Sequence, residues 1–224
     1  LRAALAKGVY LDGPALTRLN DLCYGELTGF AVENVLHIDC IEEMTEHPLN
    51  ETFAGRRRNG RQSFWKCPTH ILRPTSAAAE SLSRCVDYTY AEVAPCCMGV
   101  FENTLGGRVF VAGYYPWEQL QNLSKSSQLK SVMRWLSKDT LPAYVSSFHR
   151  VNLWARETGP GRYAIALLNA YLDPADSLEL RIRTERTSLD FFDKTSARTT
   201  VSASDRQGPY ARFALPPLPA WEVA

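Results

Sequence analysis

Residues 106–117 read GGRVFVAGYYPW, and this stretch separates two possible folds. A dinucleotide-binding turn requires G-x-G-x-x-G directly after a strand and at the start of a helix. Here the glycine pair precedes the apolar run and Pro116 follows it, which is the wrong order for a nucleotide site. The glycines instead predict the turn of a β-hairpin between two strand-like segments, CCMGVFEN (96–103) and GRVFVAGY (107–114).

The residues before this hairpin predict an α/β layer. Residues 1–8, LRAALAKG, have helical spacing and end in a glycine, and VYL (9–11) is strand-like. Asp12 followed by Pro14 is typical of an N-cap and a helix start, and this second helix is expected to stop near Gly25. Helix, strand and helix joined by short connections favour an α/β architecture.

Strand-like runs and two more helices are expected up to residue 142. AAAESLSRC (77–85) predicts a short helix, and residues 124–142 predict a longer amphipathic helix with serines near its start for capping. This longer helix is interpreted as a linker. The other expected strands are QSFWKC (62–67), THILRP (69–74) and CVDYTYAEV (85–93).

The last eighty residues or so have all-β character. Short alternating segments are separated by turn-forming sequences such as TGPG and DPADS, which is typical of a small antiparallel β-sandwich. We therefore expect an α/β domain with a mixed sheet at residues 1–145, ending in the linker helix, and a sandwich at residues 146–224. The sandwich strands are HRVNLWARE (149–157), GRYAIALLNAY (161–171), SLELRIRT (177–184), LDFFDKT (189–195), ARTTVSA (197–203) and YARFALPP (210–217).

Composition narrows the classes of function. The formal net charge is +1, which gives no electrostatic reason to expect nucleic acid as a partner. No apolar run approaches the roughly 18 residues of a membrane helix, so no membrane partner is expected. Six cysteines without a C-x-x-C pair predict free thiols, which favour a cytoplasmic location. The chain begins at Leu1 within a helical pattern, so we expect it to be the C-terminal part of a longer protein.

Three aromatic residues are the candidate carbohydrate-binding site. Tyr114, Tyr115 and Trp117 follow the predicted hairpin, and exposed aromatic faces could stack on a sugar ring. The alternative is that they pack at the edge of the sheet. Trp154, within an alternating strand, is expected in the core of the sandwich.

The densest polar cluster lies at residues 37–47 and holds His37, Asp39, Glu42, Glu43, Glu46 and His47. It has no H-E-x-x-H or other compact metal spacing, so no metal or cofactor is predicted. No serine lies in a G-x-S-x-G elbow, and no pair of acids is singled out for glycoside chemistry. No catalytic residue is predicted, and a solvated loop is the simplest interpretation of the cluster.

Taken in order, the segments resemble the C-terminal part of glycoside hydrolase family 42 β-galactosidases and related bacterial-type enzymes. GVYLDGPALTRLNDLCYGELTGF (8–30) and the hairpin at residues 100–117 are similar to parts of the glutamine-amidotransferase-like trimerisation domain of that family. Residues 149–182, together with RFALPPLPAWEVA (212–224), are similar to its terminal β-sandwich. The first strands of an amidotransferase-like domain are absent, and CYG replaces the glycine-rich turn expected near Cys23.

The resemblance implies a role in carbohydrate metabolism without catalysis by this chain, because the two catalytic glutamates of that family lie in a barrel domain with no counterpart here. It implies an accessory part of a glycoside hydrolase that contacts carbohydrate as part of the parent enzyme, where it could form one wall of the sugar cleft, and that forms a homo-oligomer. Two alternatives are a stand-alone carbohydrate-binding module that uses Tyr114, Tyr115 and Trp117, and an independent hydrolase with a site around residues 37–47. Whether the chain is an enzyme is left open.

Overall fold

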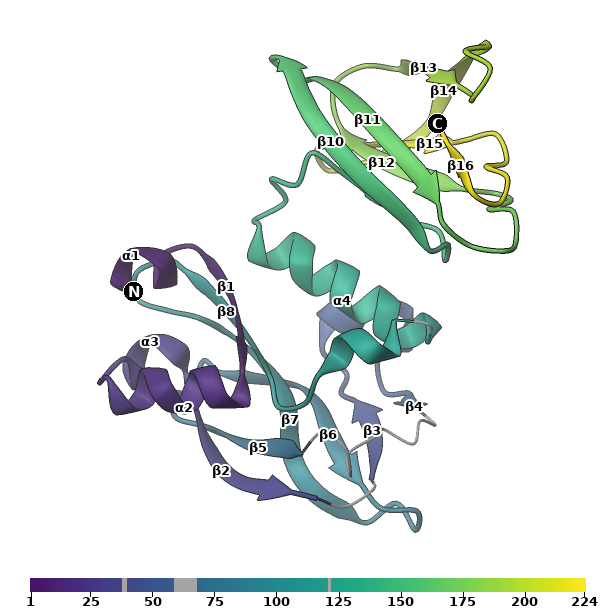
Figure 1. Cartoon of the computed structure of the whole chain (residues 1–224). Helices are drawn as coiled ribbons and strands as arrows, with labels where there is room; N and C mark the ends of the chain where they lie inside the picture. The colour runs from purple at the N-terminus through teal and green to yellow at the C-terminus, as the bar shows by residue number, and fades with distance from the viewer. Residues whose placement is uncertain (38–39, 59–67, 121) are drawn as a thin grey trace. The chain divides into compact units, whose positions relative to one another are not determined.

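The computed structural model describes residues 1–37, 40–58, 68–120 and 122–224 (Figure 1). The chain forms two compact units, Leu1–Lys138 (the N-terminal unit) and Asp139–Ala224 (the C-terminal unit). The sequence places the boundary later, after residue 145. The described residues are mostly in strands, and the only helices longer than one or two turns are α2 (Gly13–Asp21) and α4 (Leu123–Leu136).

A mixed six-stranded sheet forms the centre of the N-terminal unit, in the order β1-β8-β7-β6-β3-β4. β1 and β8 are parallel, and the other neighbours are antiparallel. A separate antiparallel pair is made by β2 and β5. The strand bounds are β1 (Gly8–Asp12), β2 (Phe30–Leu36), β3 (Ile41–Met44), β4 (Arg57–Arg58), β5 (Thr69–Pro74), β6 (Glu80–Val86), β7 (Glu92–Glu102) and β8 (Arg108–Ala112).

The β7–β8 hairpin confirms the interpretation of the glycine pair. Gly106 has φ +72°, which a residue without Cβ adopts readily. At Gly107 a Cβ would lie 1.8 Å from the carbonyl oxygen of Leu5, so only glycine fits there. The Asn103 side chain closes the turn by accepting the Leu105 and Gly107 N–H groups, both at 3.0 Å.

Two cores lie on opposite faces of this sheet because β8 is buried on both sides. Phe110 packs in a cluster with Leu129 and Val132 of α4. Val109 and Val111, which alternate with Phe110, belong to a second cluster that includes Leu16 and Leu19 of α2 and Phe30 of β2. Successive side chains of β8 therefore point to opposite faces of the sheet, so that one face packs against α4 and the other against α2.

Side chains cap the two longest helices, and one of the two caps was predicted. Asp12 caps α2 by accepting the Ala15 N–H at 2.8 Å, as predicted. α4 is capped by Asn122, whose Oδ1 accepts from the Ser124 N–H, and not by a serine as expected. Two shorter helices, α1 (Arg2–Leu5) and α3 (Gly25–Thr28), and two 3-10 helices, η1 (Pro48–Phe53) and η2 (Pro116–Gln119), complete the unit. No helix in the described part of the chain combines the length and apolar character that a membrane crossing needs.

Several expected elements are wrong. No helix forms at residues 77–85, because residues 80–85 belong to strand β6, which pairs with β3 and β7. The single strand predicted at residues 85–93 is broken by a turn, because the Asp87 carboxylate accepts the Thr89 and Ala91 N–H groups at 2.7 and 3.0 Å. The strand expected at residues 62–67 lies outside the described residues. The sheet is mixed, as expected, but the unit is richer in strands than the predicted α/β layer, and an amidotransferase-like fold remains a prediction.

Two antiparallel sheets form the C-terminal unit, in the orders β10-β11-β16 and β13-β14-β15-β12-β9. Their shared core includes Leu178, Leu180, Phe213 and Leu167, and β12 alternates between buried and less buried residues as its sequence predicts. The bounds are β9 (Ala143–Val145), β10 (Val151–Gly159), β11 (Arg162–Asn169), β12 (Glu179–Arg183), β13 (Ser188–Phe192), β14 (Arg198–Gln207), β15 (Tyr210–Ala214) and β16 (Glu222–Val223).

Candidate functional site

The three predicted aromatic residues do not share one exposed face. Tyr114 is only 5% exposed, and its hydroxyl donates to Glu42 Oε2 at 2.6 Å. Trp117 is half-buried against the core, with its ring centroid 5.6 Å from that of Tyr10. Only Tyr115, 53% exposed, offers an open ring. Tyr114 is therefore unavailable for stacking on a sugar, and the predicted platform is reduced to Tyr115 with part of Trp117.

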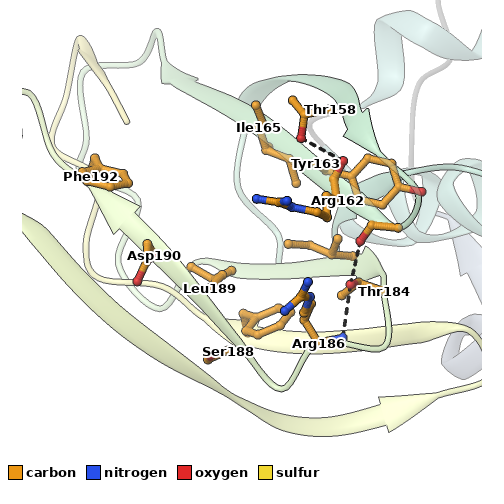
Figure 2. Close-up of a pocket in the computed structure, with 14 residues that line it drawn as sticks. Thr158, Arg162, Tyr163, Ile165, Thr184, Arg186, Ser188, Leu189, Asp190 and Phe192 are labelled. Atoms are coloured by element: carbon orange, nitrogen blue, oxygen red, sulfur yellow. Dashed lines mark hydrogen bonds between the residues drawn. The ribbon is translucent and has the colours of Figure 1, made fainter.

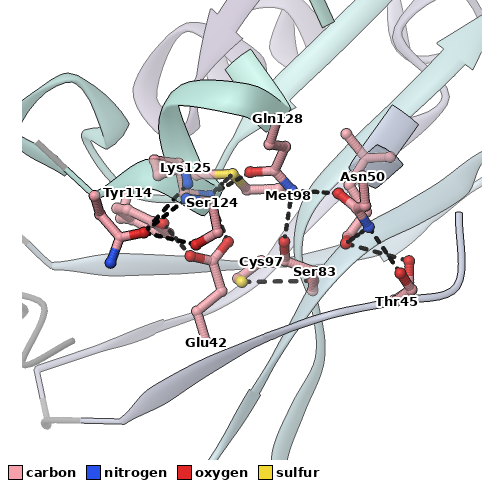
Figure 3. Close-up of polar contacts among 12 residues, drawn as sticks. Glu42, Thr45, Asn50, Ser83, Cys97, Met98, Tyr114, Ser124, Lys125 and Gln128 are labelled. Atoms are coloured by element: carbon pink, nitrogen blue, oxygen red, sulfur yellow. Dashed lines mark hydrogen bonds and ion pairs between the residues drawn. The ribbon is translucent and has the colours of Figure 1, made fainter. Parts of the chain in front are cut away.

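A buried ion pair lies at the centre of the N-terminal unit (Figure 3). Lys125 Nζ of α4 lies 2.6 Å from Glu42 Oε1 of β3, and both side chains are completely buried. The same Nζ contacts Met98 Sδ at 3.3 Å and also bonds Gln128 Oε1. Removal of two charges from water is costly, and these short contacts with the Tyr114 bond offset that cost.

Gln128 extends the network toward β6 and η1. Its Nε2 donates to Asn50 Oδ1 at 2.7 Å and to Ser83 Oγ at 3.1 Å. The Asn50 amide in turn donates to the Leu82 carbonyl at 2.9 Å. Because these side chains are buried and bonded to one another, the network ties α4 to β3, β6, β7 and η1 and presents no open face to a substrate.

The polar cluster at residues 37–47 is divided among separate local roles. Glu42 is buried in the ion pair, whereas Glu43 binds the guanidinium groups of Arg57 and Arg84, which lower the pKa of its carboxyl. Asp39 lies outside the described residues. Among the described residues no group of three or more His, Cys, Asp or Glu side chains could hold a metal ion.

His47 has a structural role at the start of η1. Its Nδ1 accepts the Leu49 N–H at 3.1 Å, and its Nε2 lies 3.4 Å from Glu80 Oε2. Burial lowers the pKa of His47, and the neighbouring Glu80 carboxylate opposes that shift only in part. The neutral imidazole is therefore favoured, as capping through Nδ1 requires.

The C-terminal unit contains a pocket of about 570 Å³ between its two sheets (Figure 2). Its volume falls within the range of roughly 300–1,000 Å³ that small-molecule sites occupy. Apolar side chains from four strands form its floor, namely Ile165, Ile182, Leu189 and Phe213. A smaller apolar pocket of about 120 Å³ shares several of these residues and continues toward Leu167, Leu180 and Leu215.

Two neighbouring turns bring polar residues to the pocket (Figure 2). The β10–β11 turn contains Gly161 at φ +65° and is followed by Arg162. The Thr184 hydroxyl donates to the Gly161 carbonyl at 3.1 Å and accepts the Arg186 N–H at 3.2 Å. This buried threonine therefore fixes both turns to each other and places Arg162 and Arg186 on the same pocket.

Asp190 is the carboxylate among the residues that line this pocket. Arg198 lies 2.9 Å from its Oδ1, and the Thr200 hydroxyl donates to the same oxygen at 3.0 Å. The hydrogen bond from Arg198 lowers the pKa of Asp190, so the group stays ionised at neutral pH. The pocket can thus offer cationic and hydroxyl groups above an apolar floor, the combination that orients a small polar ligand.

Sequence reasoning missed this pocket and misplaced Trp154. Arg162 lies at the start of a predicted strand and Arg186 between two predicted strands, positions where an arginine usually indicates only a solvated surface. Trp154 is 57% exposed and not in the sandwich core, because its neighbour Leu153 points inward and successive side chains along β10 alternate. The alternation of side chains along the strand could have predicted this, because Val151 and Leu153 are two residues apart and both pack against the core, which leaves Trp154 on the opposite face.

Comparison with known proteins shows a likeness of fold. No protein-family model matches the sequence, and the comparison with curated proteins finds no match. The fold is similar to that of the solved structure of alpha-L-fucosidase isoenzyme 2 from Paenibacillus thiaminolyticus, with a TM-score of 0.52 and 12% sequence identity. The likeness covers 88% of this chain but only 34% of the fucosidase chain, so this chain spans about a third of that protein.

Proposed function

We propose that this chain is a non-catalytic accessory portion of a protein related to glycoside hydrolases, and that it contacts carbohydrate. The observation that carries the proposal is the fold likeness, which extends over 88% of this chain and 34% of a fucosidase chain. Hydrolysis would then depend on carboxylates outside this chain. The proposal includes self-assembly and kinship with family 42 β-galactosidases, as the resemblance of the sequence implies.

The pocket of the C-terminal unit is the proposed sugar-contacting surface. A pyranose presents apolar C–H faces and a ring of hydroxyl groups. The apolar side chains of Ile182 and Phe213 can contact the C–H faces, and the hydroxyl groups of Thr158 and Ser188 can bond the sugar hydroxyls (Figure 2). In the N-terminal unit, by contrast, Glu42 and Lys125 are already engaged with each other and completely buried.

Two assays of the purified chain test the accessory role. Incubation with nitrophenyl α-L-fucoside and nitrophenyl β-D-galactoside is expected to give no release of nitrophenol, while a glycan array is expected to show binding. Turnover that survives repeated purification and disappears in the Glu46→Gln, His47→Asn double variant would instead support a hydrolase with a site around residues 37–47. Sedimentation velocity tests self-assembly, and a monomer at every concentration would contradict that part of the proposal.

A blocking variant locates the binding surface. Ser188→Trp fills the mouth of the pocket and is expected to abolish glycan binding. Thr187→Trp is the matched control, because Thr187 is the adjacent exposed residue and does not line the pocket. Equal binding by both variants would place the carbohydrate elsewhere, and Tyr115→Ala would then test the remaining exposed aromatic ring.

A further inference from the structure

We propose that the pocket of the C-terminal unit recognises a sugar that carries an acidic group, either a carboxylate or a sulfate. This inference rests on the proposed function, because it specifies the class of sugar bound at the same site. Arg162 and Arg186 are exposed, and both line the pocket, one from β11 and the other from the segment between β12 and β13 (Figure 2). Two guanidinium groups on one pocket are an unusual choice for a neutral ligand.

The positive charge of these arginines is available to a ligand. Within the part of the chain that the structure describes, neither the Arg162 nor the Arg186 guanidinium forms an ion pair with a carboxylate. Their backbone groups take part in the turn, since the Arg162 carbonyl accepts from Thr158 Oγ1 at 3.2 Å and the Arg186 N–H binds Thr184. The backbone at both arginines is thus held by hydrogen bonds, while the guanidinium groups have no carboxylate partner among the described residues.

The neighbouring carboxylates are occupied by other groups. Glu157 accepts the Gly161 N–H at 3.2 Å, and Glu185 lies 3.7 Å from Arg206 Nη1. Asp190, on the pocket itself, is paired with Arg198 at 2.9 Å. The local surplus of positive charge therefore falls on Arg162 and Arg186, where an incoming anion would meet it.

The geometry also favours a sugar acid over a small inorganic anion. The planar guanidinium binds a carboxylate or sulfate through two parallel N–H···O bonds. In the same pocket, Ile182, Leu189 and Phe213 offer an apolar surface that a free phosphate or sulfate would leave uncovered. A pyranose with an acidic substituent uses both parts of the pocket, its ring on the floor and its anion at the rim.

A matched pair of monosaccharides provides the test. Methyl β-D-glucuronide and methyl β-D-glucoside differ only in the carboxylate at C6, and glucose 6-sulfate supplies the alternative anion. Each is titrated into the whole chain, with the arginine Nε–H resonances followed by NMR. The glucuronide, the sulfate or both are expected to bind at least ten-fold more tightly than the glucoside, and raised salt is expected to weaken that binding.

Arginine variants assign the effect to the pocket. Arg162→Gln and Arg186→Gln are each expected to weaken binding of the acidic sugar about ten-fold or more, as loss of a charge-assisted bond predicts. Arg156→Gln removes the same charge from an exposed β10 position outside the pocket and is expected to bind like the unmodified chain. Because all three arginines are exposed, the variants are expected to keep the thermal unfolding midpoint.

The outcomes separate this inference from the proposed function. Equal affinity for glucuronide and glucoside, blocked by Ser188→Trp, would overturn acid recognition and leave the sugar-binding role standing. Equal loss in Arg156→Gln would show that general charge, and not the pocket, attracts the ligand, and would also overturn the inference. Absence of binding by all three sugars and by the glycan array would contradict both proposals.

Discussion

Lys125 Nζ lies 2.6 Å from Glu42 Oε1 although 82 residues separate the two in the sequence, and neither side chain reaches solvent. Loss of one partner leaves an unpaired charge in the core, which typically costs about 3–5 kcal/mol. We expect Lys125→Met to lower the free energy of unfolding by about that amount. Urea denaturation followed by circular dichroism measures the loss.

A double variant measures how much of this loss comes from the interaction between Glu42 and Lys125. Glu42→Gln with Lys125→Met removes both charges, so its destabilisation is expected to be smaller than the sum of the two single effects. Additive losses would show that the two groups do not interact in solution, contrary to the structure.

Acidification is expected to weaken the N-terminal unit through His47. Because burial lowers the pKa of this imidazole in the folded state, the unfolded chain binds the proton more readily. The stabilisation is complete above the ordinary histidine pKa of roughly 6.5, declines as the pH falls through that value, and levels off below the folded pKa. Unfolding free energies at pH 8 and pH 5.5 measure the decline.

His47→Asn is the control for this pH dependence, because asparagine can accept the Leu49 N–H but does not titrate. We expect a flatter dependence between the two pH values in this variant. The same slope in both proteins would assign the effect to another group.

Two glycines near the hairpin are expected to tolerate alanine very differently. A Cβ on Gly113 would lie 2.1 Å from the backbone oxygen of His70 and 2.7 Å from that of Cys97, neither of which can move aside freely. We expect Gly113→Ala to cost about 3 kcal/mol or more. Gly106→Ala meets no atom within 4 Å and suffers only its φ of +72°, a cost of about 1–2 kcal/mol. Equal losses on urea denaturation would contradict the close backbone approach at Gly113.

The exposed Trp154 and the buried Phe213 provide a contrast within the C-terminal unit. Phe213→Ala removes a fully buried ring and is expected to cost about 3–5 kcal/mol. Trp154→Ala removes a larger ring that is 57% exposed and is expected to cost less than about 1 kcal/mol. Scanning calorimetry compares the two, and a large loss in Trp154→Ala would show that its ring is packed in solution.

Local features of the fold were predictable from sequence because nearby residues determine them. The Asp12 cap, the β7–β8 turn and the body of α4 each depend on residues within a few positions of one another. The break at Asp87 was not predicted, since it depends on one carboxylate that captures backbone N–H groups which β-propensity alone assigns to a strand.

The candidate site was beyond sequence reasoning for a different reason. Arg162 and Arg186 line one pocket because Thr184 joins two turns of the C-terminal unit, and the buried Tyr114 hydroxyl finds its partner in Glu42, 72 residues away. Neither contact leaves a periodic or spacing signal in the chain. The sequence identified Tyr114 as an aromatic residue able to stack, and the fold uses it as a hydrogen-bond donor in the core.

The parallel pairing of β1 with β8 also constrains the order in which the chain can fold. Gly8 of β1 pairs with Arg108 of β8, so the first strand has no sheet neighbour until about a hundred more residues have been synthesised. During translation, the antiparallel β7–β8 hairpin can form from adjacent residues, and β1 must wait to dock on its outer edge. Of the strands in this sheet, the one synthesised first is therefore among the last to join it.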